Sequence, residues 1–494
     1  MLMSAGEPKR TRRKFWQIKM ELTRRAFLAG LAGGVLSARA MAASRINFVF
    51  ILADDLGWKD LSCFGNPYFA TPNIDRLAVQ GARFTNAYAA CPVCSPTRAS
   101  ILTGKYPVRT GVTDWIPGRP SHEKGPIITP RTATELRRAE ITIVERLGTA
   151  GYKSASIGKW HLGGEGFLPT DQGFGENIGG NNSGSPPRSV QPYFGPFELP
   201  NLKGGPGEFL TEMLTEAAVG FIHRNKANPF LLYLPHYTVH IPLGAREADI
   251  ARQQDKSLGR YNPVYAAMVE SLDRSVGQVL TAIDRAGVGE RTMVIFFSDN
   301  GGLRYEGKAE APVTNNSPLR AGKGHLYEGG IREPLIVRYP GVVKPGSVID
   351  TTVSSVDFFP TMCDLADLKP GDVDGISLMP LLRGGSAKPR PLFWHYPHYS
   401  NQGGEPGSAI REGDWKLIEF HRDGRRELYN LREDISETRN VVEKQPETAK
   451  RLAVRLDEWR KRSGAIMPGE NPAADPAWAG WELSGEEKPT PPVR

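Results

Sequence analysis

The segment 94–98, Cys-Ser-Pro-Thr-Arg, combines a candidate nucleophile with a proline and an arginine, and an apolar run follows it. Pro96 fixes its own φ and disfavours helical geometry in the residue before it, so we expect a helix over 97–102 with Cys94 just before its first turn. Such a position favours an anionic ligand or a thiolate. Two other interpretations are open at this point: a buried cysteine before an ordinary helix, and a redox pair with Cys91 in C-x-x-C spacing.

Four side chains with oxygen donors follow two apolar runs of strand length, 46–52 and 293–297; they are Asp54, Asp55, Asp299 and Asn300. In open α/β sheets, ligands bind at the carboxyl ends of the strands. Three carboxylates and one amide oxygen suit a hard divalent cation, and the number of protein ligands favours Ca²⁺ over Mg²⁺. Taken alone, an Asp-Asp pair is an ordinary solvated turn. The shared position after strands instead predicts a metal site.

Basic side chains occupy comparable positions, after expected strands or at the expected helix start; they are Arg98, Lys159, His161, His240 and Lys323. Each one alone fits a surface lysine or a histidine satisfied by its neighbours. So many cations near one metal ion are explained when a dianionic or tetrahedral anionic group binds there. The sequence therefore predicts an anion site beside the metal.

The elements that must position these residues alternate between strand and helix. Strands are expected at 46–52, 153–157, 229–234, 293–297 and 335–339, and helices at 72–77 (capped by Thr71), 97–102, 141–147, 211–224 and 263–287. The strand runs are continuously apolar, which is typical of strands buried on both faces of a parallel sheet. We therefore predict an α/β fold with a large, mostly parallel mixed sheet flanked by helices.

A change of pattern follows a linker at 382–390. Strand-like pieces at 392–396, 409–420 and 426–431 precede a helix at 446–462, which predicts a smaller C-terminal α+β domain with an antiparallel sheet. The expected division of the chain is a leader (1–43), a catalytic domain (44–381), the smaller domain (382–465) and a Pro-rich tail (466–494).

The 494-residue chain carries a formal net charge of +8, which raises the question of nucleic-acid binding. Nine Lys or Arg residues and two Glu residues lie in 1–43, so the rest of the chain is nearly neutral and no nucleic-acid partner is expected. The leader is similar to a twin-arginine export signal: Arg24-Arg25, a short apolar region, then small residues around Ala40. That region is too short for a membrane span. We expect export by the twin-arginine machinery to the periplasm or the exterior, with Met1 or Met20 as the start.

The segment 94–104 resembles the C-x-P-x-R signature of the type I sulfatases, within the alkaline-phosphatase-like superfamily. Other family motifs are matched in order by Asp54-Asp55, Gly158–His161, His240–Pro242, Ser298–Gly301 and Gly322-Lys323 with Glu328–Gly330. The resemblance covers about residues 46–465. It implies an enzyme that hydrolyses sulfate esters, and we expect a sulfated carbohydrate as the substrate in preference to a small aryl sulfate.

The resemblance further implies that a formylglycine-generating enzyme oxidises Cys94 to Cα-formylglycine before export. One hydroxyl of the aldehyde hydrate would attack the sulfate ester, helped by the metal and Asp299, and the other would later expel sulfate. Residue 94 would thus also belong to the metal site. Arg98 and His161 would hold the hydrate and assist its deprotonation. Lys159 would neutralise sulfate, and His240 with Lys323 would serve the leaving oxygen.

Two other functions are open: a phosphonate monoester or phosphodiester hydrolase of the same superfamily, and a non-catalytic binding protein with unmodified Cys94. Contacts to the group that bears the sulfate are expected from the Gly/Asn/Pro-rich loop within 164–208, above all 173–196, and from His395, Tyr396 and His398. Ordinary loop and sheet packing explains these residues equally well.

Overall fold

The computed structural model describes residues 45–121, 123–187, 191–257, 261–304 and 313–475. The predicted export leader at 1–43 and the last part of the Pro-rich tail lie outside the described residues. In the part of the chain that is described, no helix is both long and apolar enough to cross a membrane.

The large sheet has the strand order β11-β2-β10-β9-β1-β8-β4-β5, with β12 beside β2. Its strands are β1 (Asn47–Ala53), β2 (Ala82–Tyr88), β4 (Lys153–Ile157), β5 (Glu176–Ile178), β8 (Phe230–Pro235), β9 (Thr292–Ser298), β10 (Arg332–Arg338), β11 (Ser347–Ile349) and β12 (Val353–Ser354). The run from β9 to β5 is parallel, whereas β10 is antiparallel to both of its neighbours. The predicted mostly parallel mixed sheet is confirmed.

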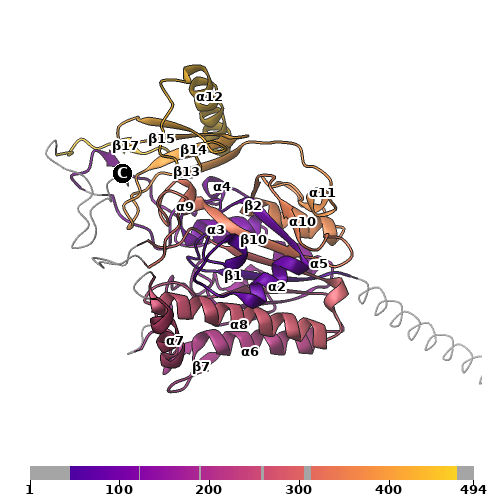
Figure 1. Ribbon diagram of the computed structural model, residues 1–494. Helices are drawn as coiled ribbons and strands as arrows, with labels where there is room; N and C mark the ends of the chain where they lie inside the picture. The colour runs from indigo at the N-terminus through magenta and orange to yellow at the C-terminus, as the bar shows by residue number, and fades with distance from the viewer. Residues whose placement is uncertain (1–44, 122, 188–190, 258–260, 305–312, 476–494) are drawn as a thin grey trace, which may run out of the picture.

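Helices cover both faces of this sheet (Figure 1). One face packs against α2 (Pro72–Gln80), α6 (Leu210–Asn225) and α8 (Pro263–Arg285), and the other against α3 (Cys94–Thr103), α5 (Ile143–Thr149) and α10 (Phe358–Leu365). Strand β1 shows why its sequence does not alternate: Val49 and Ile51 enter one core, while Phe48 and Phe50 enter the other.

A second, antiparallel sheet follows in the order β13 (Leu392–Tyr396), β14 (Gly407–Glu412), β15 (Trp415–Phe420) and β16 (Arg426–Asn430). Helix α12 (Pro446–Ser463) lies on its outer face, at the top of Figure 1. The inner face packs against Cys91 and Val93, directly before the nucleophile candidate. The predicted antiparallel C-terminal sheet is thus confirmed, and the exact domain boundaries stay a prediction.

Short elements complete the described chain: α4 (Pro107–Thr110), α7 (Glu247–Ser257), α9 (Glu328–Ile331), α11 (Met379–Leu382), β3 (Ile127–Ile128), β6 (Phe197–Leu199), β7 (Leu202–Gly204) and β17 (Gly469–Glu470). Strand β17 pairs with β3, so the start of the expected tail is bound to the body of the protein.

Three local expectations were wrong. The piece at 409–420 is two strands, β14 and β15, because Gly413 adopts a φ of 59° and turns the chain between them. The Thr71 hydroxyl does not cap α2 but donates to the Asp75 carboxylate, 3.0 Å away. Helix α3 begins at Cys94 instead of after Pro96. A proline in the first helical turn removes no hydrogen bond, because the first N–H groups of a helix have no partner within it.

Candidate active site

The acidic residues predicted to bind a metal lie at the carboxyl ends of β1 and β9, which are adjacent and parallel. Ala53 is in register with Ser298, so Asp54 and Asp299 leave the sheet side by side. The backbone N–H of Asp55 donates to Asp299 Oδ1 at 3.3 Å, and Asn300 Nδ2 donates to Asp55 Oδ1 at 2.8 Å. The structure therefore brings all four predicted oxygen donors together.

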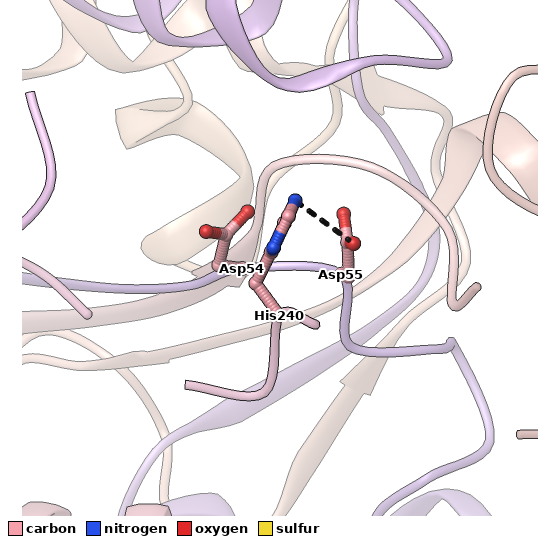
Figure 2. A group of neighbouring side chains, drawn as sticks. All are labelled: Asp54, Asp55 and His240. Carbon is pink, nitrogen blue, oxygen red and sulfur yellow. Dashed lines mark ion pairs between the residues drawn. The ribbon is translucent and has the colours of Figure 1, made fainter. Parts of the chain in front are cut away.

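Two of these buried oxygens have no hydrogen-bond partner: Asp54 Oδ1 and Asn300 Oδ1. Burial raises the pKa of the Asp54 carboxyl, with Lys159 opposing the shift. Two groups of side chains have ligand atoms within 4.8 Å of one another, and Figure 2 shows the first: Asp54, Asp55 and His240; and Asp54, Cys94 and Asp299. A buried carboxylate oxygen and a buried amide oxygen without partners are both available as ligands, so this donor set fits a divalent metal ion. The sequence did not single out His240 for this group.

Three cations pair with the three carboxylates. Lys159 Nζ lies 2.7 Å from Asp54 Oδ2, Lys323 Nζ lies 2.7 Å from Asp55 Oδ2, and Arg98 Nε lies 2.8 Å from Asp299 Oδ2; the last pairing is predicted by no sequence pattern. Burial alone would raise the pKa of Asp55, but the Lys323 ammonium holds it well below its usual range. The charges of the protein groups are therefore closely matched before any ligand binds.

Cys94 and His161 form the other side of the site. Cys94 is the first residue of α3, and its Sγ lies 3.4 Å from His161 Nδ1. The other ring nitrogen, Nε2, lies 2.6 Å from the carbonyl oxygen of Ile116, which can only accept. Nε2 therefore carries the proton, and Nδ1 faces residue 94 as an acceptor. Burial also lowers the pKa of His161, so the imidazole is neutral.

The redox interpretation of Cys91 and Cys94 is not supported. Both cysteines are free thiols in the structure. Burial raises the pKa of Cys94 and raises that of Cys91 well above its ordinary value. A redox-active dithiol instead needs a lowered thiol pKa.

His240 and Lys323 lie where the site is most open. Their side chains are 12% and 8% exposed, whereas those of Asp54, Arg98 and Lys159 are fully buried. Lys323 Nζ is 3.2 Å from His240 Nε2, and His240 Nδ1 lies 2.5 Å from the carbonyl oxygen of Ile241. Nε2 is therefore the acceptor of the pair, and these two side chains form the least buried side of the site.

Three backbone groups that hold the site have no sequence signal. The carbonyl of Ile116 fixes the His161 ring, the carbonyl of Asn181 accepts from the His161 backbone N–H at 2.9 Å, and the Tyr193 hydroxyl lies 2.7 Å from the carbonyl of His240. A backbone carbonyl is present at every position, so no residue type reveals these contacts.

The C-terminal side chains named as substrate contacts are instead buried and bonded within the protein. Tyr396 Oη donates to Asp114 Oδ1 at 2.9 Å, and His398 Nε2 lies 2.9 Å from Thr113 Oγ1. His395 is also buried, between Ser408 and the carbonyl of Ile466. Tyr396 and His398 thus stabilise the loop that carries Ile116. Their contacts agree with the alternative that these residues have a packing role.

The fold and the site define a hydrolase class: a mostly parallel α/β sheet whose strand ends gather a metal-type donor set, a nucleophile position and several cations. The family model described as Sulfatase matches residues 46–368, and that described as N-sulphoglucosamine sulphohydrolase, C-terminal, matches residues 321–462. The chain belongs to the sulfatase family and is a sulfuric ester hydrolase.

Similar proteins cover most of the chain. A sulfatase of Formosa agariphila is 35% identical, over 81% of this chain and 85% of its own length. Human arylsulfatase A is 34% identical, over 80% of this chain and 78% of its own length. The crystal structure of Ps i-CgsB in complex with k-i-k-neocarrahexaose superposes with a TM-score of 0.72 at 29% identity, over 84% of this chain and 93% of that one.

Proposed function

We propose that this enzyme removes sulfate from a sulfated carbohydrate, using a formylglycine formed from Cys94 and a bound Ca²⁺. The observation that carries the proposal is the position of Cys94, whose sulfur faces neutral His161 and shares a ligand group with Asp54 and Asp299. A nucleophile at residue 94 would therefore lie both beside a general base and beside the metal.

Asp54, Asp55, Asp299 and Asn300 would hold the cation. Their all-oxygen donor set favours Ca²⁺ over softer metals, and the number of protein ligands favours it over Mg²⁺. When bound, the ion acts as a Lewis acid toward sulfate oxygens and makes the residue-94 hydroxyl more acidic. The protein cations and carboxylates here are matched in number, so a divalent ion adds the positive charge that an anionic ester needs.

Formylglycine at position 94 would supply an aldehyde hydrate with two hydroxyls, the second of which allows sulfate to leave. The Nδ1 atom of His161 is placed to accept a proton from residue 94, because its Nε2 proton is committed to Ile116. Arg98 holds Asp299 in position through Nε and Nη2. Maturation requires a formylglycine-generating enzyme as a partner.

The remaining basic residues differ in how deeply they are buried, and we assign their roles accordingly. Lys159 is fully buried against Asp54, so we assign it to charge neutralisation at the sulfate. Lys323 and His240 lie at the open side, where the leaving oxygen of the ester would lie. The ammonium of Lys323 can pass a proton to that oxygen, and the neutral His240 orients the ammonium by accepting a hydrogen bond at Nε2.

A carbohydrate substrate is supported by the relatives. N-acetylgalactosamine-6-sulfatase of the dog is 34% identical over 73% of this chain and 71% of its own length. The complex of Ps i-CgsB contains a neocarrahexaose. The phosphonate monoester hydrolase of Agrobacterium radiobacter shares the fold, at 20% identity and a TM-score of 0.62, and a likeness at this level carries no argument about the substrate.

Two measurements on purified enzyme, produced together with a formylglycine-generating enzyme, test the proposal. Mass spectrometry of the peptide that contains residue 94 should find an aldehyde in place of the thiol. Release of inorganic sulfate from a panel of defined sulfated saccharides should exceed turnover of phosphonate monoesters and phosphodiesters. An intact thiol in active protein, or faster phosphodiester turnover, would contradict the proposal.

Export of the folded and modified enzyme through the twin-arginine machinery is the corresponding proposal for its location. Replacing Arg24 and Arg25 by Lys should retain the protein in the cytoplasm, whereas the unchanged leader should deliver it to the periplasm or medium. Export of the double variant at the normal rate would contradict this location signal.

A further inference from the structure

A cavity of about 400 Å³ lies between a loop that contacts His161 and a short hairpin. One wall is the loop 181–187, which follows β5, and the other is the hairpin of β6 and β7. Side chains from both walls line it, among them Asn181, Ser183, Ser185, Pro186, Phe197 and Glu198. This volume lies in the range of sites for small organic ligands.

The loop wall is adjacent to the candidate active site. Gly184 lies between two of the lining serines, and a Cβ at Gly184 would fall 2.5 Å from Cε1 of His161. The His161 backbone N–H donates to the carbonyl oxygen of Asn181. A group bound in the cavity is therefore separated from the His161 ring by one layer of loop residues.

The hairpin wall presents an aromatic ring in a fixed position. Phe197 pairs with Gly204 across the hairpin, and a Cβ at Gly204 would fall 2.5 Å from the Phe197 ring, so only glycine lets the ring rest there. Leu199 is buried in the main core and anchors the hairpin. Tyr193, just before the hairpin, bonds to the His240 carbonyl. The ring is therefore held in place on the same framework as the active site.

The lining has the chemistry of a sugar site. The Phe197 ring can pack against the C–H face of a pyranose. The Ser185 hydroxyl and the amide N–H groups of Asn181 can bond to its hydroxyls, whereas the Ser183 hydroxyl and Asn181 Oδ1 are already bonded within the loop. Among the described residues that line the cavity, the one charged side chain is Glu198, which pairs with Lys203 at 2.8 Å. Lys203 neutralises this carboxylate, and no Lys, Arg or His is among the described lining residues, so the lining offers no cation for a second sulfate group.

We propose that this cavity is a subsite for an unsulfated sugar residue that adjoins the sugar carrying the scissile ester. This proposal depends on the proposed carbohydrate substrate. In it, Phe197 and the loop 181–187 recognise the neighbouring sugar.

The test compares two substrates: a small aryl sulfate, which has no sugar, and a sulfated oligosaccharide hydrolysed by the unaltered enzyme. Phe197→Ala should lower kcat/KM for the oligosaccharide by about tenfold, mainly through KM, and leave the aryl sulfate unaffected. Phe197→Leu keeps apolar volume and tests the ring itself. Val348→Ala, on exposed β11 at the other edge of the sheet, is the matched control. Equal losses on both substrates, or no loss on either, would overturn the subsite.

Two further comparisons separate the outcomes. The desulfated oligosaccharide should inhibit aryl sulfate hydrolysis by the unaltered enzyme about tenfold more strongly than by Phe197→Ala, and equal inhibition would also overturn the proposal. A substrate sulfated on the neighbouring sugar should be hydrolysed more slowly, and Glu198→Gln should reduce that difference; faster hydrolysis of it would contradict an unsulfated occupant. If the unaltered enzyme hydrolyses the aryl sulfate but none of the saccharides, the carbohydrate proposal itself fails.

Discussion

The imidazole Nδ1 of His161 faces the sulfur of Cys94 at 3.4 Å, and the opposite ring nitrogen is fixed by the carbonyl oxygen of Ile116 at 2.6 Å. The Ile116 contact decides the tautomer: the nitrogen toward residue 94 is the one that lacks a proton. Burial of both groups keeps them neutral. The pair is therefore arranged for proton transfer away from residue 94.

Replacing His161 by Phe keeps a ring in this place and removes the proton acceptor. We expect kcat for an aryl sulfate to fall by about 10² to 10⁴-fold, the usual contribution of a general base, with a smaller change in KM. His223→Phe, at an exposed position of α6, is the control. Mass spectrometry must show that residue 94 is still modified. Near-normal kcat in fully modified protein would exclude His161 as the base.

The unpartnered oxygens of Asp54 and Asn300 lead to a prediction about metal removal. Dialysis against a chelator should abolish activity and lower the unfolding temperature, because the ion binds the native state and its removal leaves Asp54 Oδ1 and Asn300 Oδ1 without a partner. Ca²⁺ should restore both better than Mg²⁺. Asp54→Asn should raise the Ca²⁺ concentration needed for half-maximal activity, whereas the exposed Asp423→Asn should not. Full activity in metal-free protein would disprove the metal site.

The sequence predicted which residues form the site better than it predicted how they are held. Asp54 and Asp299 follow continuously apolar runs, and such runs indicate buried strands wherever they occur. That β1 and β9 are neighbours depends on the packing of the whole sheet, and no local pattern contains that information. The grouping was predicted from the shared position of these residues after strands, and the family resemblance supported it.

Other features depend on contacts between distant parts of the chain, or on a helix that accepts a proline in its first turn. The residue types alone predict neither. Helix α3 starts at Cys94 because the first helical turn accepts Pro96. Tyr396 and His398 were candidates for substrate contact, but their hydroxyl and ring nitrogen bond to the 113–114 segment. Polar side chains that follow a strand look the same in the sequence whether they line a binding site or form buried hydrogen bonds within the protein.

Because several histidines are buried, we expect the protein to lose stability in acid. His398 allows the contribution of one such histidine to be measured. Burial lowers the pKa of His398 to about 3, from 6.5. Between these values the unfolded chain binds a proton that the native state does not, so native stability falls as the pH drops below about 6.5. Each pH unit below that costs about 1.4 kcal/mol relative to a variant without the group.

His398→Gln cannot bind this proton in either state. Its unfolding temperature, measured from pH 7.5 to pH 5, should therefore fall less steeply than that of the unaltered enzyme. The exposed His223→Gln should follow the unaltered enzyme. Parallel curves for His398→Gln and the unaltered enzyme would mean that His398 is not held neutral by burial.

Arg98 is predicted to support both stability and activity, through the geometry of its guanidinium. Nε and Nη2 lie 2.8 and 2.7 Å from Asp299 Oδ2, and Nη1 donates to the carbonyl oxygen of Lys159 at 2.9 Å. All of these side chains are fully buried. Removing the guanidinium leaves the Asp299 carboxylate without its partner, and breaking a buried ion pair in this way costs about 3–5 kcal/mol.

Arg98→Ala should therefore lower the unfolding temperature strongly and abolish activity. Arg98→Lys keeps the charge, but one ammonium cannot reach Asp299 and the Lys159 carbonyl in the same fork geometry. We expect it to recover much of the stability while kcat stays at least about tenfold low, because Asp299 is no longer fixed beside residue 94. Thermal unfolding and sulfate release on the same samples separate these effects. Normal kcat in Arg98→Lys would show that positive charge alone is required at this position.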